Sequence, residues 1–193
     1  AAQLHGTCMM TLNEILTIRP PDASCELSDS AALLRRLTVE PDDQARAQAA
    51  RFLSGYVEED EEATTALRTV LTSLASGEGK GASVLITGPP GSGKSHLLGA
   101  LLLLAGSDEA RRIMARQRKD LTGPLRALHQ APPLLVVPIP LNDHRGQEEL
   151  LEDIIFERTE WQLRRKPYNV QVPLSQHAYA LELVQRHVVP RYQ

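Results

Sequence analysis

One run of residues has types and an order suited to binding phosphate. Residues 88–95 read Gly-Pro-Pro-Gly-Ser-Gly-Lys-Ser, which fits the phosphate-binding pattern G-x-x-x-x-G-K-[ST]. Glycines allow the backbone to curl so that successive amide N–H groups converge on a bound anion. A helix that begins near Gly93 would add the positive end of its dipole. The run therefore predicts a site for the phosphates of ATP together with Mg2+.

The side chains of this run suggest separate roles. Lys94 is expected to place its charge on the β- and γ-phosphates and to stabilise charge during phosphoryl transfer. The hydroxyl of Ser95 is expected to complete the ligand shell of the Mg2+ ion. For the ring of His96, local packing or capping is favoured over a catalytic role. The predicted nucleotide contacts come from the run and the residue after it, namely Gly88, Pro89, Pro90, Gly91, Ser92, Gly93, Lys94, Ser95 and His96.

Hydrolysis of ATP needs an acidic residue besides the loop, and Asp143 is the nearby candidate. It follows an apolar run, as the magnesium-binding acid of a P-loop ATPase follows a strand. Pro138 and Pro140 stand two residues apart, so they remove N–H donors from one side of that strand, which is typical of an edge strand. Because the acid-bearing strand normally lies inside the sheet, Asp143 is better explained as a cap of the following helix. The true second acidic motif is then expected beyond Gln193.

Hydrophobic patterning indicates the elements that position the loop. Apolar runs at 82–87 and 134–141 predict two strands, the first leading directly into the loop. Apolar residues at helical spacing predict helices over 30–40, 42–55, 58–74, 93–105, 108–118, 121–130, 147–165 and from Ser175 onward. The expected fold is α/β, an AAA-like P-loop NTPase with a partial parallel sheet. Residues 1–80 form its helical lead and 81–193 its incomplete N-terminal part, as a fragment of a larger chain.

Composition restricts the class of protein. Of the 193 residues, 42% are hydrophobic and 23% are charged, and the net charge is −3. These values exclude a collagen-like or mainly disordered chain and argue against a protein that coats nucleic acid. Cys8, Cys25 and His5 have spacings that fit neither a zinc site nor a disulfide framework. Without a secretion signal or a membrane-length apolar run, the prediction is a cytoplasmic protein.

A basic segment follows the predicted phosphate-binding helix. It contains Arg111, Arg112, Arg116, Arg118 and Lys119. A DNA-contacting face is one interpretation of this cluster. A solvated helix face is favoured, because no aromatic residues alternate with the arginines to stack on bases.

The run VLITGPPGSGKSHLLGALLLLAG, with the preceding FLSGYVEEDEEATTALRTVLTSL, resembles the start of the large ATPases of BREX phage-defence systems, of the PglY and BrxC type. In both, the P-loop Lys-Ser is followed by His and Leu, here at 94–97. The resemblance covers most of residues 30–165, although its motifs are diffuse outside the P-loop. It implies ATP as ligand, an oligomeric parent ATPase, and other defence proteins as partners near DNA. The chain departs from the family pattern by ending before a second acidic motif, sensor or arginine finger.

Two other functions remain open at this point. A small P-loop kinase that phosphorylates a nucleotide or metabolite uses the same loop and has a similar length, and the arginines at 111–118 would serve as its lid. Against it, such a kinase needs a complete sheet, for which the chain offers too few strands. The other alternative is a scaffold that binds nucleotide without hydrolysing it and so orders an assembly surface.

Overall fold

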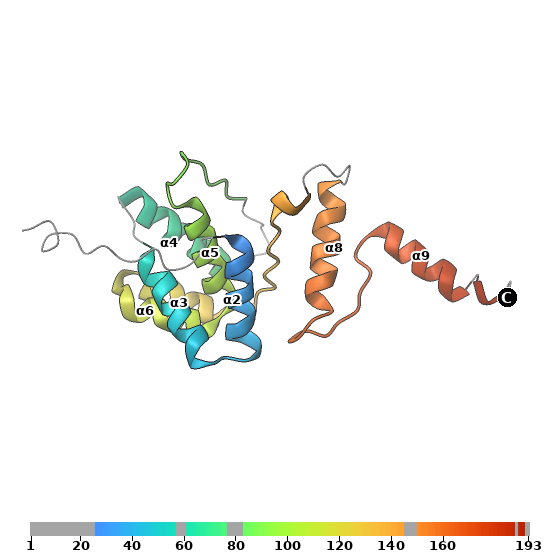
Figure 1. The fold of residues 1–193 in the computed structure, drawn as a ribbon, viewed down its shortest axis with the longest axis horizontal. Helices are drawn as coiled ribbons and strands as arrows, with labels where there is room; N and C mark the ends of the chain where they lie inside the picture. Colours follow the sequence, from blue (N-terminus) through green and yellow to red (C-terminus); the bar gives the residue numbers. More distant parts are fainter. Residues whose placement is uncertain (1–25, 57–60, 77–82, 145–149, 188, 192–193) are drawn as a thin grey trace, which may run out of the picture.

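The computed structural model describes residues 26–56, 61–76, 83–144, 150–187 and 189–191. Within these ranges every regular element is a helix, and Figure 1 shows their arrangement. The α-helices are α2 (Leu27–Val39), α3 (Asp43–Gly55), α4 (Glu61–Ser76), α5 (Lys94–Gly106), α6 (Asp108–Gln117), α7 (Thr122–Gln130), α8 (Leu151–Leu163) and α9 (Gln176–His187). Short 3-10 helices occupy Lys119–Leu121, Leu141–His144 and Val189–Arg191.

Helix α5 forms the centre of a helical bundle. It is apolar on nearly every side, as expected for a helix surrounded by others, and Leu103 and Leu104 are fully buried. It packs against α2, α4 and α6, while α3 packs on α6 and α4 on α7. Two glycines let neighbours approach closely, because a Cβ at Gly99 would lie 2.7 Å from Phe52 Cζ and one at Gly106 would lie 2.7 Å from the Leu34 side chain. Helices from both sides of residue 80 therefore share one core.

Local capping explains where two of these helices begin. The carboxylate of Asp42 accepts a hydrogen bond from the N–H of Ala45 and caps α3. Arg36 donates to the same carboxylate at 3.1 Å. The amide of Ala45 and then the Arg36 guanidinium lower the pKa of Asp42, because both favour its charged form. Ser107 caps α6 in the same way, accepting from the N–H of Ala110 at 3.3 Å.

The helical predictions agree with the structure to within a few residues, but the two predicted strands are wrong. Residues 83–87 form an irregular segment and not a strand, and Val84 and Leu85 are 58% and 87% exposed. Residues 134–140 are also irregular, and they run between α7 and the 3-10 helix at Leu141–His144. An extended segment becomes a strand only when a neighbour completes its hydrogen-bond ladder, and the described residues supply none. The predicted α/β P-loop fold with a parallel sheet is therefore not the fold of the described chain.

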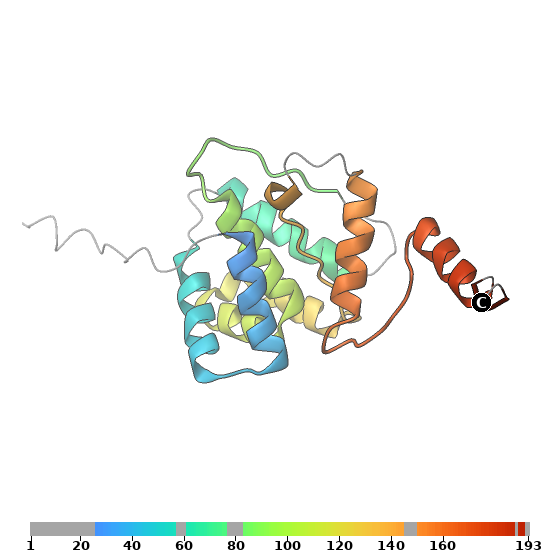
Figure 2. The ribbon, with the colours of Figure 1, turned by 45° about the vertical axis from the view of Figure 1, so that its right-hand side comes forward.

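Helix α8 stands beside the bundle, and α9 lies beyond it (Figures 1 and 2). Ile154 is the buried residue of α8. After α8 the chain turns back, with the N–H of Val170 donating to Leu163 O at 2.8 Å and the N–H of Leu174 donating to Glu160 Oε1 at 2.7 Å. Helix α8 is thus held more by its own return segment than by the bundle.

A membrane-crossing helix would need about 20 consecutive apolar residues. Among the described parts of the chain, none of the helices combines that length with sufficient apolar character.

Candidate functional site

The predicted phosphate-binding residues form a loop that projects from the bundle and enters α5. Gly91 and Gly93 have φ angles of 82° and 77°, in the left-handed region that glycine adopts without penalty. The N–H of Ser92 donates to Pro89 O at 3.3 Å, which closes a turn. A Cβ at Gly88 would lie 2.7 Å from Ser92 Oγ. The glycines predicted to allow a tight curl are therefore at the positions where the chain curls.

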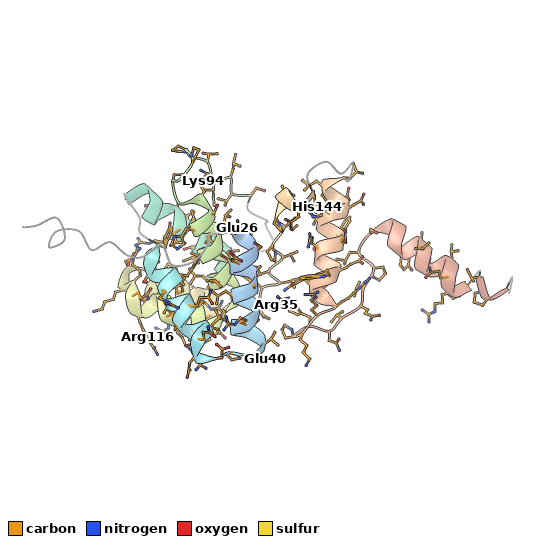
Figure 3. The ribbon with its side chains drawn as sticks, in the orientation of Figure 1. Glu26, Arg35, Glu40, Lys94, Arg116 and His144 are labelled. Carbon is orange, nitrogen blue, oxygen red and sulfur yellow. The ribbon has the colours of Figure 1, made fainter. Side chains whose placement is uncertain are left out.

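The side chain of Lys94 folds back over this loop (Figure 3). Its Nζ donates to the carbonyl oxygens of Gly88 at 2.8 Å and Pro89 at 2.6 Å, and contacts Ser92 Oγ at 3.3 Å. The ammonium group thus lies inside the curl, bound to neutral acceptors. An incoming phosphate would offer it a charged acceptor, which makes a stronger hydrogen bond than a carbonyl.

The loop also presents the N-terminus of α5. Gly93 is the N-cap residue and has no side chain to accept from the first-turn N–H groups. These groups lack partners within the helix, and they carry the positive end of its dipole. Ser95 lies in this first turn and is exposed. A phosphate could accept from these amides, while the Ser95 hydroxyl is available as an oxygen ligand for Mg2+.

His96 connects the start of α5 to α3. Its Nε2 lies 2.7 Å from Phe52 O, and a carbonyl only accepts, so the ring donates this hydrogen bond. The imidazole also makes edge contacts with Phe52 and Tyr56, with ring centroids 4.5 Å and 5.6 Å apart. Local packing or capping was favoured for His96 from the sequence, and in the structure the ring instead packs against α3. The partner of His96 could not be identified from local sequence signals, because Phe52 lies 44 positions away.

Asp143 does not cap the helix that follows it, which is the role favoured from the sequence. Helix α8 begins at Leu151 with Leu150 as N-cap and no side-chain cap, so Asp143 is not its cap. Asp143 lies instead in the 3-10 helix Leu141–His144, with its Oδ2 3.8 Å from Nη2 of Arg158. Figure 3 shows Lys94 and His144 in different regions of the molecule. The structure therefore does not bring Asp143 and the loop together.

The basic cluster is engaged in local contacts. Arg111 donates to the carbonyls of Leu104 at 2.7 Å and Ala105 at 3.1 Å, at the C-terminal end of α5. Arg112 pairs with Glu109, and Arg118 with Asp120. Because α5 has 13 residues, Arg111 lies about 20 Å along the helix axis from the loop. The arginines do not converge on the loop as a kinase lid would.

Groups of three or more His, Cys, Asp or Glu side chains able to hold a metal ion do not occur in the described part of the chain. His5, Cys8 and Cys25 lie outside the described residues. At the loop, the exposed hydroxyl of Ser95 remains the protein oxygen predicted for Mg2+.

Comparisons with known proteins do not add a functional assignment. No family model, curated protein or solved structure matches this chain.

Proposed function

We propose that residues 88–95 bind the phosphate groups of Mg-ATP. The observation that carries the proposal is the conjunction of three features in one loop. Two glycines adopt left-handed backbone angles, the ammonium of Lys94 lies within the curl, and the N-terminus of α5 follows without a side-chain cap. Amides, helix dipole and lysine all favour an anion at the same place.

Within this proposal each residue has a distinct part. The N–H groups of the first turn of α5 hold the phosphate oxygens, and Lys94 exchanges its bonds to Gly88 O and Pro89 O for bonds to phosphate. Ser95 contributes its hydroxyl to Mg2+. His96 acts indirectly, because its hydrogen bond to Phe52 fixes the first turn of α5 relative to α3.

Beyond binding, we propose on the strength of the BREX resemblance that the parent protein is a cytoplasmic, oligomeric ATPase. It would act with other defence proteins near DNA. Binding without turnover, as in a nucleotide-ordered scaffold, is the second candidate for this chain. It is favoured by one observation, the engagement of Asp143 with Arg158 away from the loop.

Calorimetry with Mg-ATP tests the binding proposal. The Lys94→Ala variant is expected to bind at least about tenfold more weakly, since it loses a charge-assisted contact worth about 1.5 kcal/mol or more. Lys119→Ala is the matched control, because Lys119 is an exposed lysine outside the loop. Equal affinities of Lys94→Ala and the unmodified chain would overturn the proposal, as would failure of the unmodified chain to bind.

Phosphate release in the same samples separates the two candidates. Turnover above the Lys94→Ala background would place the catalytic acid in this chain, and Asp143→Asn would then be tested first. Binding without turnover would favour the scaffold for this chain.

A further inference from the structure

A cavity lies between α2 and the C-terminal end of α8, and residues 88–95 of the loop do not contribute to its lining. Its volume is about 290 Å3, at the lower end of the range for small-molecule sites. Its apolar lining includes Leu27, Leu34, Val136, Val137, Pro138 and Pro140. The irregular segment 134–140, predicted as a strand, thus forms part of this wall.

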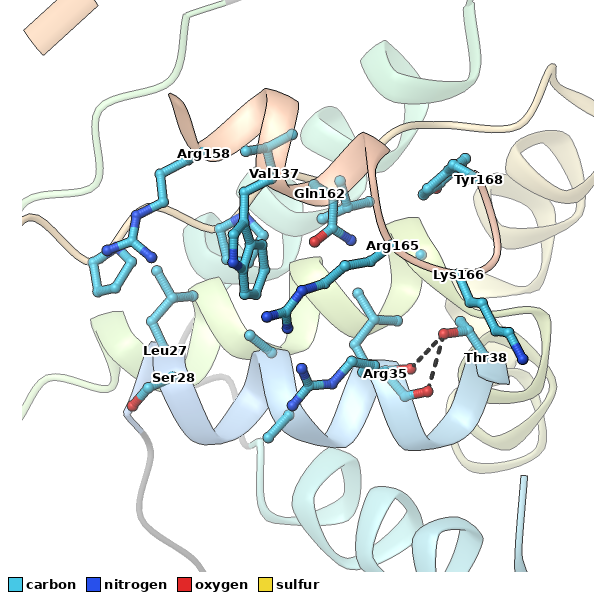
Figure 4. A pocket seen from close by; sticks show the side chains of 18 of the residues that line it. Leu27, Ser28, Arg35, Thr38, Val137, Arg158, Gln162, Arg165, Lys166 and Tyr168 are labelled. Carbon is cyan, nitrogen blue, oxygen red and sulfur yellow. Dashed lines mark hydrogen bonds between the residues drawn. The ribbon is translucent and has the colours of Figure 1, made fainter. Parts of the chain in front are cut away.

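The polar part of the lining is strongly cationic. Arg35 comes from α2, Arg158 from α8, and Arg165 and Lys166 from the turn after α8. Figure 4 shows the guanidinium groups of Arg35 and Arg165 pointing into the same space from opposite walls. Asp143 is the single carboxylate in the lining, and it lies 3.8 Å from Arg158.

This accumulation of positive charge is only partly balanced. In the described parts of the chain, no carboxylate forms an ion pair with Arg35, Arg165 or Lys166. The guanidinium carbon of Arg165 instead lies 3.5 Å from the centroid of the Trp161 ring. Cations that converge without counter-charge repel one another, and an anion between them relieves that repulsion.

We propose that this cavity binds a small amphipathic anion, a phosphate or carboxylate group on an apolar body. The anionic group would lie between Arg35 and Arg165, and the apolar body would lie against the wall formed by Leu34, Val136 and Val137. Such a ligand contacts both α2 and the end of α8, so it holds α8 against the bundle. A free inorganic anion would leave the apolar wall solvated, and a neutral hydrocarbon would leave the cations without an acceptor.

Trp161 gives a reporter specific to this cavity, because it is the only tryptophan of the chain and lines the cavity. It is 42% exposed, so a ligand that covers it should shift its emission to shorter wavelength. The full chain is titrated with octyl phosphate below its micelle concentration. Octanol, which has the apolar body alone, and inorganic phosphate, which has the charge alone, are titrated in parallel.

Octyl phosphate is expected to shift the Trp161 emission in a saturable way. The ligand concentration at the midpoint of this shift should be at least about tenfold lower for octyl phosphate than for octanol or inorganic phosphate. Arg35→Gln/Arg165→Gln should raise that midpoint about tenfold, two partly exposed ion pairs being worth together about 1.4 kcal/mol. Arg35→Lys/Arg165→Lys, which keeps the charges, should retain most of the affinity and shows that the effect is not misfolding. Arg112→Gln/Arg116→Gln, on α6, and Lys94→Ala, in the loop, should leave the midpoint unchanged.

Four results would overturn the proposal. An equal response to octanol would mean a merely apolar patch, and an equal response to inorganic phosphate would mean a surface charge effect. An unchanged midpoint in Arg35→Gln/Arg165→Gln, or the absence of any saturable shift, would exclude the site.

Discussion

Replacing Gly99 by alanine tests whether α5 is packed as tightly against α2 and α3 as the structure indicates. A Cβ at this position would lie 2.5 Å from Ser30 Oγ and 2.7 Å from Phe52 Cζ. The serine hydroxyl can rotate away, but the Phe52 ring is 5% exposed and has little room to move. Overpacking of this kind costs about 1–3 kcal/mol, whereas the better helix propensity of alanine returns about 1 kcal/mol. Since the ring is the rigid neighbour, we expect a net loss of about 1–2 kcal/mol in the free energy of unfolding.

Urea denaturation followed by circular dichroism measures this loss, and Gly123→Ala is the matched control. Gly123 lies in α7, where an added Cβ would meet no atom within 4 Å. Alanine there should change the free energy of unfolding by less than about 0.5 kcal/mol, because the gain in helix propensity is offset by crowding of the added Cβ against the ring of Pro124. Only Gly99→Ala is therefore expected to lower the stability clearly. If Gly99→Ala proved as stable as the unmodified chain or more stable, the close approach of α5 to α3 would be refuted.

Two further predictions concern the segment before the loop and the start of α6. Leu85→Ala should change the free energy of unfolding by less than about 0.5 kcal/mol, because Leu85 is 87% exposed. Urea denaturation measures this change, and a loss of about 2–5 kcal/mol would instead indicate a buried strand. Burial acts to raise the pKa of Asp108, but the hydrogen bonds from Arg111 and His129 and the charges of these groups together outweigh it, so the pKa is lowered. Its contribution to stability should therefore be present above the ordinary aspartate pKa of about 3.9 and be lost as the pH falls through the lower native value. The difference in unfolding free energy between the unmodified chain and Asp108→Asn should shrink in that acid range, and a difference independent of pH would contradict this assignment.

The helices could be predicted from the sequence because their signals are local. Leucines at helical spacing mark α2, and a capping Asp42 marks the start of α3. The strands could not be predicted in the same way, since a short apolar run has the same appearance in a strand and in an extended loop segment. What distinguishes them is a partner for the backbone N–H and C=O groups, and that partner is a property of the tertiary structure.

The candidate site likewise has a part that local sequence signals predict and a part that depends on tertiary structure. The order of glycines, Lys94 and Ser95 specified a curled loop that opens a helix, and the structure has that loop. The anchor of His96 on Phe52 and the meeting of Arg35 with Arg165 join residues far apart in sequence. Neither pair is marked by a sequence motif. The contact of α3 with α5 brings Phe52 to His96, and the position of α8 beside α2 brings Arg165 to Arg35.

The loop at residues 88–95, which we propose binds phosphate, is held in place by the rest of the structure on its downstream side only. Downstream, the loop continues into α5, whose later turns form the centre of the bundle and whose first turn is tied to α3 through His96. Upstream, Val84 and Leu85 are exposed and contribute little burial. The amide groups that would meet a phosphate belong to the first turn of a core helix, so they are positioned by the same packing that folds the bundle. A phosphate ligand that requires those amides in place binds the native state in preference to the unfolded chain, and its binding free energy is then added to the stability of the bundle.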